Sequence, residues 1–170
     1  MPPPLRAAAA LGISYRPIAD ADLPFLFEVY GSTRVEELEQ TGWPVEMKVQ
    51  FLQQQFTAQH DHYQRHYPDA EWLVIVRESD SAGRLYVEEW PSQIRLIDIA
   101  ILPQFRRLGV GSAILSDLCE QASEKGKPLS IHVEKSNPAR SLYDRMGFVF
   151  AQENGAYDLL EWRPKAAADI

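Results

Sequence analysis

A nearly all-apolar segment between two breaks constrains the fold of this chain more than any other feature. Residues 94–102, set off by Pro91-Ser92-Gln93 and by Pro103, scarcely alternate between apolar and polar side chains. A strand buried on both faces of a sheet has this composition. Residues 109–125 follow with apolar positions at helical spacing, and Gly126 marks their end. The chain must therefore place a central strand beneath packed helices.

Further strands and helices are predicted on both sides of this segment. Alternation and turn residues predict strands at residues 13–18, 71–78, 84–90, 94–102, 129–134, 148–152 and 157–162. Residues 79–83 are expected to form the turn between the second and third strands. Helices are predicted after Asp20 or Asp22 and at residues 44–66, 109–125 and 138–146. The order β-α-α-β-β-β-α-β-α-β-β predicts an α/β (mixed α+β) fold with a central mixed twisted sheet and helices on both faces.

The two ends of the chain are expected to lie outside the folded domain. Residues 1–12 combine a Pro-rich start, an alanine run and one charge at Arg6, which indicates a disordered leader rather than a signal peptide. Residues 13–163 are expected to form the single domain, and residues 164–170 a flexible tail.

Composition excludes several classes of protein. With 170 residues, 45% of them hydrophobic, the chain can bury a full core, and no apolar stretch approaches the ~20 residues that cross a bilayer. The one cysteine, Cys119, forms no internal disulfide, and no Cys/His cluster has the spacing of a zinc site. We therefore expect a cytoplasmic protein without a membrane contact and without a structural metal.

The charge of the chain is acidic overall but not in every segment. A formal net charge of -7 makes non-specific binding to DNA or RNA unfavourable. Residues 104–145 nevertheless carry seven basic and five acidic side chains, a net charge of +2. This segment is either a chance cluster of solvated charges or the part of the protein that holds a small anionic ligand.

The connection between the buried strand and the following helix has the properties of an anion site. Gly109 and Gly111 let the backbone approach a ligand, and the first N–H groups of a helix have no intrahelical acceptor. Arg106 and Arg107 can add hydrogen bonds to phosphate oxygens. The plain alternative is a helix start with two incidental glycines. A dinucleotide fingerprint fails because Ile114 occupies the place of its third glycine, and the Gly-Lys-Ser/Thr run of a P-loop is missing.

Two motifs together resemble those of the GNAT superfamily of N-acetyltransferases. The first is the arginine-x-x-Gly-x-Gly loop, present as Arg106-Arg107-Leu108-Gly109-Val110-Gly111. The second is a strand followed by Asn137, then Leu142-Tyr143 and Gly147-Phe148. Both motifs in this order, with one helix and one strand between them, are strongly specific. The departure is Arg107, because a glycine commonly follows the first arginine of the loop, so the turn there is expected to differ slightly.

The resemblance implies that acetyl-CoA is the cosubstrate and that it lies between two neighbouring parallel strands that splay apart. Its pantetheine arm is expected to bind the backbone of Ile99, Ala100 and Ile101, and Asn137 is expected to reach the same arm. Its pyrophosphate is expected on the loop and the first helical turn, at Arg106, Arg107, Leu108, Gly109, Val110, Gly111 and Ser112. The resemblance implies no metal ion.

Tyr143 and His132 are the catalytic residues that we predict. By resemblance, Tyr143 donates a proton to the departing CoA thiolate, and a phenol with a pKa of about 10 holds that proton at neutral pH. The alternative for Tyr143 is a core tyrosine on an amphipathic helix. A base must take a proton from the amine, and His132 is the first candidate, with Glu134 on the same face of its strand and Asp98 as further options. The alternative for His132 is a hydrogen-bonded structural histidine.

These expectations describe an acetyl-CoA-dependent N-acetyltransferase that acts by direct attack of a primary amine on the thioester. Cys119 lies away from the reaction strands and has no activating neighbour, which argues against an acyl-enzyme. The acceptor is a small amine or a protein or peptide amine, and the acidic surface favours a cationic one. Its pocket is expected to come from the first two helices and the connection between them. The polar and aromatic residues available there are Tyr30, Arg34, Glu37, Trp43, Phe51, Gln55, Gln59 and Tyr63. A homodimer through edge strands stays open. Two alternatives are a non-catalytic acyl-CoA-binding sensor or regulatory module, and a domain that binds ATP or NAD.

Overall fold

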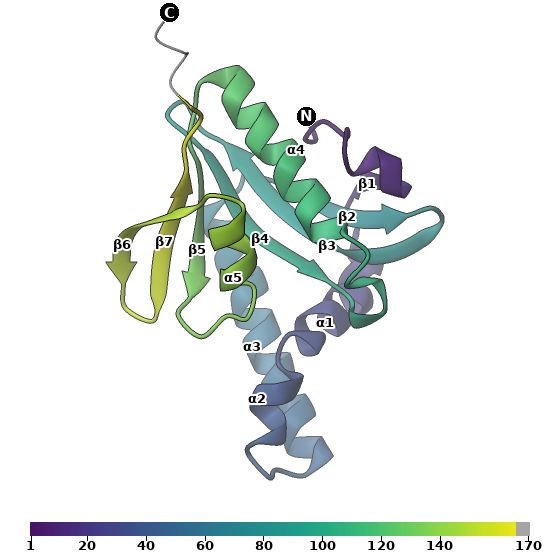
Figure 1. The fold of residues 1–170 in the computed structure, drawn as a ribbon. Coiled ribbons are helices and arrows are strands. Elements are labelled where there is room, and N and C mark those ends of the chain that lie inside the picture. Colours follow the sequence, from purple (N-terminus) through teal and green to yellow (C-terminus); the bar gives the residue numbers. More distant parts are fainter. Residues whose placement is uncertain (166–170) are drawn as a thin grey trace, which may run out of the picture.

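One sheet organises the described residues, which are 1–165 of this computed structural model (Figure 1). Its seven strands follow the order β1-β2-β3-β4-β5-β7-β6, and each neighbouring pair is antiparallel except β4 and β5, which are parallel. The predicted mixed sheet is therefore confirmed. The strands are β1 (Ile13–Pro17), β2 (Glu71–Arg77), β3 (Asp80–Glu89), β4 (Ile94–Ile101), β5 (Leu129–Glu134), β6 (Val149–Asn154) and β7 (Tyr157–Trp162).

Helices cover both faces of this sheet. They are α1 (Leu23–Ser32), α2 (Val35–Glu39), α3 (Val45–His66), α4 (Val110–Lys125) and α5 (Arg140–Arg145). In Figure 1, α4 and α5 lie on one face, while α1 and α3 lie on the other. The sequence did not predict α2, because one turn of mostly acidic residues with only Leu38 buried carries no periodic pattern. None of the helices in the described part of the chain is long and apolar enough to span a membrane.

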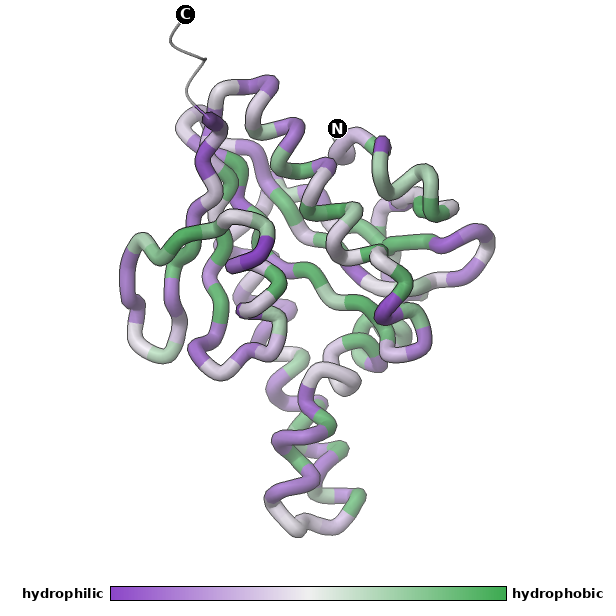
Figure 2. Tube along the Cα trace, viewed as in Figure 1, coloured by the Kyte–Doolittle hydropathy of each residue, from purple (hydrophilic) through white to green (hydrophobic). Residues whose placement is uncertain are grey.

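The larger hydrophobic core lies between the sheet and α4. Ile114 and Leu118 of α4 are fully buried there, together with Leu85, Leu96 and Leu129 from three neighbouring strands. In Figure 2 the hydrophobic residues follow these central strands and the helix face that covers them, whereas the turns are hydrophilic. Burying such side chains stabilises the fold by roughly 1.5–3 kcal/mol each relative to exposure.

A smaller cluster packs on the opposite face, where α1 meets α3. Leu26 and Tyr30 of α1 are buried against Phe56 of α3, and the Tyr30 and Phe56 ring centroids lie 6.0 Å apart. This contact fixes α3 across the sheet and leaves the first turns of α3, with α2, projecting beyond it (Figure 1).

The parallel pairing of β4 with β5 ends early. Only the first three residues of each strand pair, so the part of β4 beyond Leu96 has no partner on the β5 side. On the β3 side, Val87 lies opposite Leu96 and Tyr86 lies opposite Asp98, which leaves Ile97 as an extra residue in β4. Because such a bulge bends a strand and increases its twist, it separates the second half of β4 from β5. The two strands therefore splay apart.

Part of the first twelve residues packs against the domain, with Ala8 buried and Leu5 and Leu11 against the main core, so the predicted disordered leader is wrong for this part. The buried carboxylate of Asp117 in α4 accepts hydrogen bonds from the main-chain N–H groups of Arg6, Ala7 and Ala8, at 3.0, 2.8 and 3.0 Å. A buried carboxylate is costly without such donors, and these three satisfy it. The sequence pattern missed this anchor because it lies about 110 positions away. Of the predicted C-terminal tail, residues 166–170 lie outside the described residues.

The turn between β2 and β3 is tighter than the sequence predicts. It consists of Glu78 and Ser79, with Glu78 at φ +57°, so the expected turn residues 80–83 belong to β3 instead. Gly83 lies within β3, where an added Cβ would overlap the main-chain carbonyl oxygen of Ala100 in β4. Glycine is needed there because β3 and β4 approach each other closely, not because the chain turns.

We expect Gly83→Ala to lower the free energy of unfolding by about 1–3 kcal/mol, because the new methyl group forces β3 away from β4. Chemical denaturation measures this change. Gly31→Ala is the matched control, since the added Cβ in α1 meets only Leu52 Cδ1 at 3.7 Å, an ordinary contact. Equal stabilities for the two variants would contradict the close approach.

Candidate active site

The loop after β4 presents free main-chain N–H groups at the start of α4. Gly109 caps the helix in the left-handed conformation, at φ +82°, and its carbonyl accepts the first helical hydrogen bond from the Ala113 N–H at 3.0 Å. The N–H groups of Val110, Gly111 and Ser112 precede this bond and have no intrahelical acceptor. With the helix dipole, they form a site suited to an anion.

The two loop arginines have different roles in the turn. Arg107 has φ +63°, the left-handed conformation that favours glycine, at the position where the resembling family commonly has one. This conformation costs a side chain such as that of Arg107 roughly 1–2 kcal/mol. Arg106 donates from Nε to the carbonyl oxygen of Ile101 at 2.9 Å, which ties the loop to the end of β4. The turn therefore keeps a glycine-like shape although the residue differs.

The space around Gly111 is open on the protein side. A Cβ added at this position would find its nearest heavy atom, Leu142 Cδ2, at 3.9 Å, and Gly111 has an ordinary helical conformation. The protein itself therefore does not require a glycine at this position. A ligand that approaches the main chain here gives a reason for it.

The splayed part of β4 contains the backbone predicted to bind the cosubstrate. Ile99, Ala100 and Ile101 lie beyond the last residue that pairs with β5, so their β5-facing polar groups have no partner on that strand. The carbonyl of Ile101 is already used by Arg106. The gap and the anion-binding loop thus meet at the carboxyl end of β4.

A cavity of about 580 Å³ lies on the α3 face of the sheet, beside the bulge in β4. Its floor includes Leu96 and Ile97, and α1, α3, β5, β6 and β7 contribute to its walls. Of the residues predicted to be available for an acceptor pocket, the structure places in the lining Tyr30, Arg34, Gln55, Gln59 and Tyr63. It does not place there Glu37, Trp43 or Phe51, the last two of which pack on each other with centroids 5.5 Å apart.

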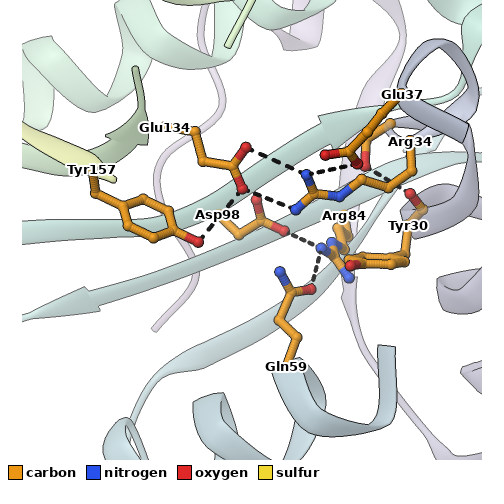
Figure 3. Close-up of polar contacts among 9 residues, drawn as sticks. Tyr30, Arg34, Glu37, Gln59, Arg84, Asp98, Glu134 and Tyr157 are labelled. Atoms are coloured by element: carbon orange, nitrogen blue, oxygen red, sulfur yellow. Dashed lines mark hydrogen bonds and ion pairs between the residues drawn. The ribbon is translucent and has the colours of Figure 1, made fainter. Parts of the chain in front are cut away.

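Two buried or half-buried arginines beside the cavity are neutralised by carboxylates (Figure 3). Arg84 of β3 is 3% exposed, pairs with Asp98 of β4 and donates from Nη2 to Gln59 Oε1 at 2.9 Å. Arg34 donates from Nη2 to Glu134 Oε1 at 2.9 Å. Asp98 and Glu134 were alternative candidates for the base, and both carboxylates are engaged with arginines instead.

His132 is held on the cavity wall by two neighbours. Its Nδ1 lies 3.1 Å from Arg95 Nη1, and its Nε2 lies 3.1 Å from the side-chain amide of Asn154. A guanidinium only donates, so Nδ1 is the acceptor in the contact with Arg95 and carries no hydrogen there. The Asn154 contact is made by its NH₂ nitrogen, which is also a donor, so it does not fix a hydrogen on Nε2. Burial, and then the positive charge of Arg95, lower the pKa of His132. The alternation predicted for β5 is confirmed, since Ile131 and Val133 enter the main core on the other face.

Arg95 is the cavity residue that the sequence analysis missed. It is 7% exposed, donates from Nε to Ser130 Oγ at 2.9 Å, and its guanidinium carbon lies 4.8 Å from the centroid of the Trp90 ring. The available signal was an arginine inside a mostly apolar strand, because arginine is almost never fully buried unless it is paired.

Tyr143 and Asn137 lie in and just before α5, on the α4 side of the sheet. Tyr143 is 3% exposed and packs edge-to-face against Phe148, with centroids 5.5 Å apart. Burial and the negative charge of Asp98 raise the pKa of Tyr143, so the phenol keeps its proton at neutral pH. Asn137 accepts the Ala139 N–H through Oδ1 at 2.8 Å, which organises the start of α5 and leaves its NH₂ group for a ligand.

The Cys119 thiol is unsuited to nucleophilic catalysis. Cys119 is buried in α4, and burial raises the pKa of its thiol to about 12, so no thiolate is available at neutral pH. Within the described range, no group of His, Cys, Asp and Glu side chains is arranged to hold a metal ion. His132 and Tyr143 can transfer protons, and they lie near a loop suited to an anion, a strand gap and a cavity.

The family model and the relatives that match this chain all describe acetyltransferases. The model of the acetyltransferase (GNAT) family matches residues 33–148. The [ribosomal protein bS18]-alanine N-acetyltransferase of Haemophilus influenzae is 44% identical over 77 residues, which are 45% of this chain and 53% of that protein. A putative enzyme of the same name from Bacillus subtilis is 29% identical over 104 residues, or 56% of this chain and 69% of that protein. The match thus spans about half the length of the first of these relatives.

Solved structures share the fold over almost the whole chain. The PaiA N-acetyltransferase of Thermoplasma acidophilum, crystallised in complex with coenzyme A, has a TM-score of 0.65 at 16% identity and covers 89% of this chain and 98% of its own. The ribosomal-protein-S18-alanine N-acetyltransferase of Escherichia coli has a TM-score of 0.55 at 18% identity, with 93% and 98% covered. At these identities the similarity shows a common fold.

The contacts of His132 lead to a prediction about its titration. We expect its pKa to lie below the ordinary value of about 6.5, and we expect Arg95→Gln to raise it, because removing the adjacent positive charge favours the imidazolium. The neutral ring therefore persists to lower pH in the wild type than in the variant. NMR titration of the histidine resonances, assigned with His132→Gln, measures both values.

Arg163→Gln is the control for this titration, because Arg163 is exposed and pairs with Glu161 at 2.8 Å. It should leave the pKa of His132 unchanged. A wild-type pKa at or above the ordinary value, or equal shifts in the two variants, would contradict the proposed contact.

Proposed function

Because this chain belongs to the acetyltransferase (GNAT) family, we propose that it transfers an acetyl group from acetyl-CoA to a primary amine. The observation that carries the proposal is the early end of β4–β5 pairing at the Ile97 bulge, next to the free N–H groups that open α4. Acetyl-CoA is an extended molecule with a diphosphate in its middle and a thioester at its end. The loop suits the first of these groups, and the strand gap suits the arm that leads to the second.

The main-chain N–H groups of Val110, Gly111 and Ser112 hold the diphosphate in this proposal. Arg106 and Arg107, with Leu108 and Gly109, form the rest of that loop. The open space at Gly111 and the glycine-like turn at Arg107 support a close approach of the ligand to the backbone. The arm follows the unpaired edge of Ile99, Ala100 and Ile101, and the NH₂ group of Asn137 reaches it from the other side of the gap.

The reaction is a direct acyl transfer. Acetyl-CoA supplies the activated acyl group, and the amine nitrogen forms a bond to the carbonyl carbon while the carbon–sulfur bond breaks. His132 takes the proton that the amine loses, and Tyr143 gives its phenolic proton to the departing sulfur. The raised pKa of Tyr143 and the lowered pKa of His132 support these assignments, because each residue then starts in the required protonation state at neutral pH. The protonated thiol of Cys119 supports transfer without an acyl-enzyme.

The acceptor enters from the α3 face through the cavity beside His132. The two relatives are named as alanine N-acetyltransferases of the ribosomal protein bS18, one of them as putative, which supports a protein amine as one class of acceptor. A cavity of about 580 Å³ also has the size of a small-molecule site. A cytoplasmic location and a homodimer stay predictions from the sequence.

Gly111→Val tests the loop. We expect it to weaken coenzyme A binding by at least about tenfold, because the branched side chain blocks the approach of a phosphate to the main chain. Isothermal titration calorimetry measures the affinity, and thermal unfolding shows whether the variant is folded. Val at a helical position costs only a few tenths of a kcal/mol relative to other residues. A folded variant with wild-type affinity would remove the loop assignment.

Tyr143→Phe tests the chemistry. We expect kcat for release of the CoA thiol, measured over a panel of primary amines, to fall by about 10²–10⁴-fold, because the leaving sulfur loses its proton donor. The affinity for acetyl-CoA should hardly change, since the ring and its contact with Phe148 are kept. If coenzyme A binds but no amine accelerates thiol release, and if Tyr143→Phe changes nothing, the protein is a CoA-binding module rather than an enzyme.

A further inference from the structure

Arg95 is a buried cation without an anionic partner. Its side chain is 7% exposed, yet within residues 1–165 no carboxylate lies within ion-pair distance of its guanidinium. Its neighbours are the neutral Ser130 hydroxyl at 2.9 Å, the His132 ring at 3.1 Å and the face of Trp90 at 4.8 Å. Removing a charge from water is expensive unless it is paired, so this arrangement needs an explanation.

The other two arginines beside the cavity each form an ion pair with a carboxylate. Arg84 pairs with Asp98, and Arg34 pairs with Glu134, in both cases through a direct ion pair (Figure 3). The fold therefore supplies a carboxylate to each of these two arginines and supplies none to Arg95.

Glu88 is the carboxylate that could have paired with Arg95, because it lies directly opposite on β3. Its Oε2 instead accepts the indole N–H of Trp90 at 2.7 Å. The guanidinium of Arg95 is directed the other way, toward Ser130 and His132 on β5. The charge of Arg95 therefore points to the cavity side of the sheet.

The cavity lining lacks negative charge in the part of the chain that the structure describes. Its charged residues are Arg34, already paired, and Arg95, and it contains no aspartate or glutamate. Most of the remaining wall is aromatic or amide-bearing, namely Tyr30, Tyr63, Tyr67, Tyr157, Gln55, Gln59 and Asn154. Such a wall accepts a small ligand that combines an apolar body with an anion.

We propose that Arg95 binds a carboxylate of the acceptor, so that the acceptor is a small amino acid or close analogue rather than an uncharged or cationic amine. This inference rests on the proposed function and names its substrate class. Because Arg95 and His132 are hydrogen-bonded to each other, the carboxylate and the reacting amine are separated by only a few bonds. The expectation from overall composition, a cationic acceptor attracted by an acidic surface, is replaced by the local charge of the cavity.

Carboxylate binding also changes what His132 can do. A carboxylate that takes the hydrogen bond from Arg95 Nη1 releases the lone pair on His132 Nδ1, which that guanidinium otherwise occupies. It also offsets the positive charge that lowers the pKa of His132, so the ring becomes a stronger base when the acceptor is bound. Substrate binding and base strength are then coupled through one guanidinium.

Two non-reacting probes test the anion site without any turnover: 3-phenylpropanoate and its uncharged analogue 3-phenylpropanamide. We expect the carboxylate to bind the wild type at least about tenfold more tightly than the amide, as measured by calorimetry, and to move the NMR titration of His132 to higher pH. Arg95→Gln should abolish this preference. Arg163→Gln, which removes an exposed arginine, should keep it. Equal affinities, no binding by either probe, or a preference that survives in Arg95→Gln would each overturn the inference.

Acetyl transfer separates this inference from the proposed function. In the wild type, kcat/KM should be higher for amines that carry a carboxylate than for amines that lack one. In Arg95→Gln this difference should disappear. Comparing one amine across the two proteins cancels its intrinsic reactivity. Thiol release with all amines alike, unchanged by Arg95→Gln, would refute the carboxylate site and leave the acetyltransferase in place. Selective transfer to a peptide terminus would refute it in favour of a protein acceptor. Carboxylate binding without thiol release for any amine would uphold the anion site and refute the enzyme.

Discussion

The site depends on one extra residue in β4. Ile97 adds a bulge at the point where β4 and β5 stop pairing, and the bend that follows opens a gap in the centre of a sheet that is otherwise continuous. Without it, the two parallel strands would satisfy each other's hydrogen bonds along their whole length. With it, polar backbone is left free beneath the start of α4, and the cavity on the α3 face lies beside the same gap.

The surroundings hold this gap open. α4 packs on β4 and β5 from one side with the fully buried Ile114 and Leu118, so the strands cannot shift to close the gap without disturbing the main core. On the other side, Tyr30 and Phe56 fix α1 against α3, and Gly83 lets β3 approach β4 closely. Burial of these side chains thus offsets the cost of the unpaired backbone, which lies between the loop at the start of α4 and the cavity on the α3 face.

The three arginines around the cavity differ in whether a carboxylate pairs with them. Arg84 pairs with Asp98 and Arg34 pairs with Glu134, which links β3 to β4 and links β5 to the residue before α2. Arg95, which is also buried, is stabilised only by a hydroxyl, an imidazole and an aromatic face. An overall net charge of -7 gave no hint of this local excess of positive charge.

Much of the fold was readable from the sequence because its signals are local. The apolar run of β4, the alternation of β5 and the glycines that flank α4 each act within a few residues, and the two motifs marked the family and the candidate loop. Long-range contacts were not readable. The anchoring of residues 6–8 by Asp117, the short helix α2 and the turn at Glu78 depend on partners or geometry that leave no periodic pattern.

The sequence by itself thus predicted the strands and every α-helix but α2, the order of these elements, and the residue types that can hold a phosphate or move a proton. Only the tertiary structure decided which carboxylates are used up by arginines, which arginine is left without one, and where the sheet opens. The reason is physical: these properties arise from burial and from pairing between strands far apart in the chain, and neither is encoded in a local pattern of side chains.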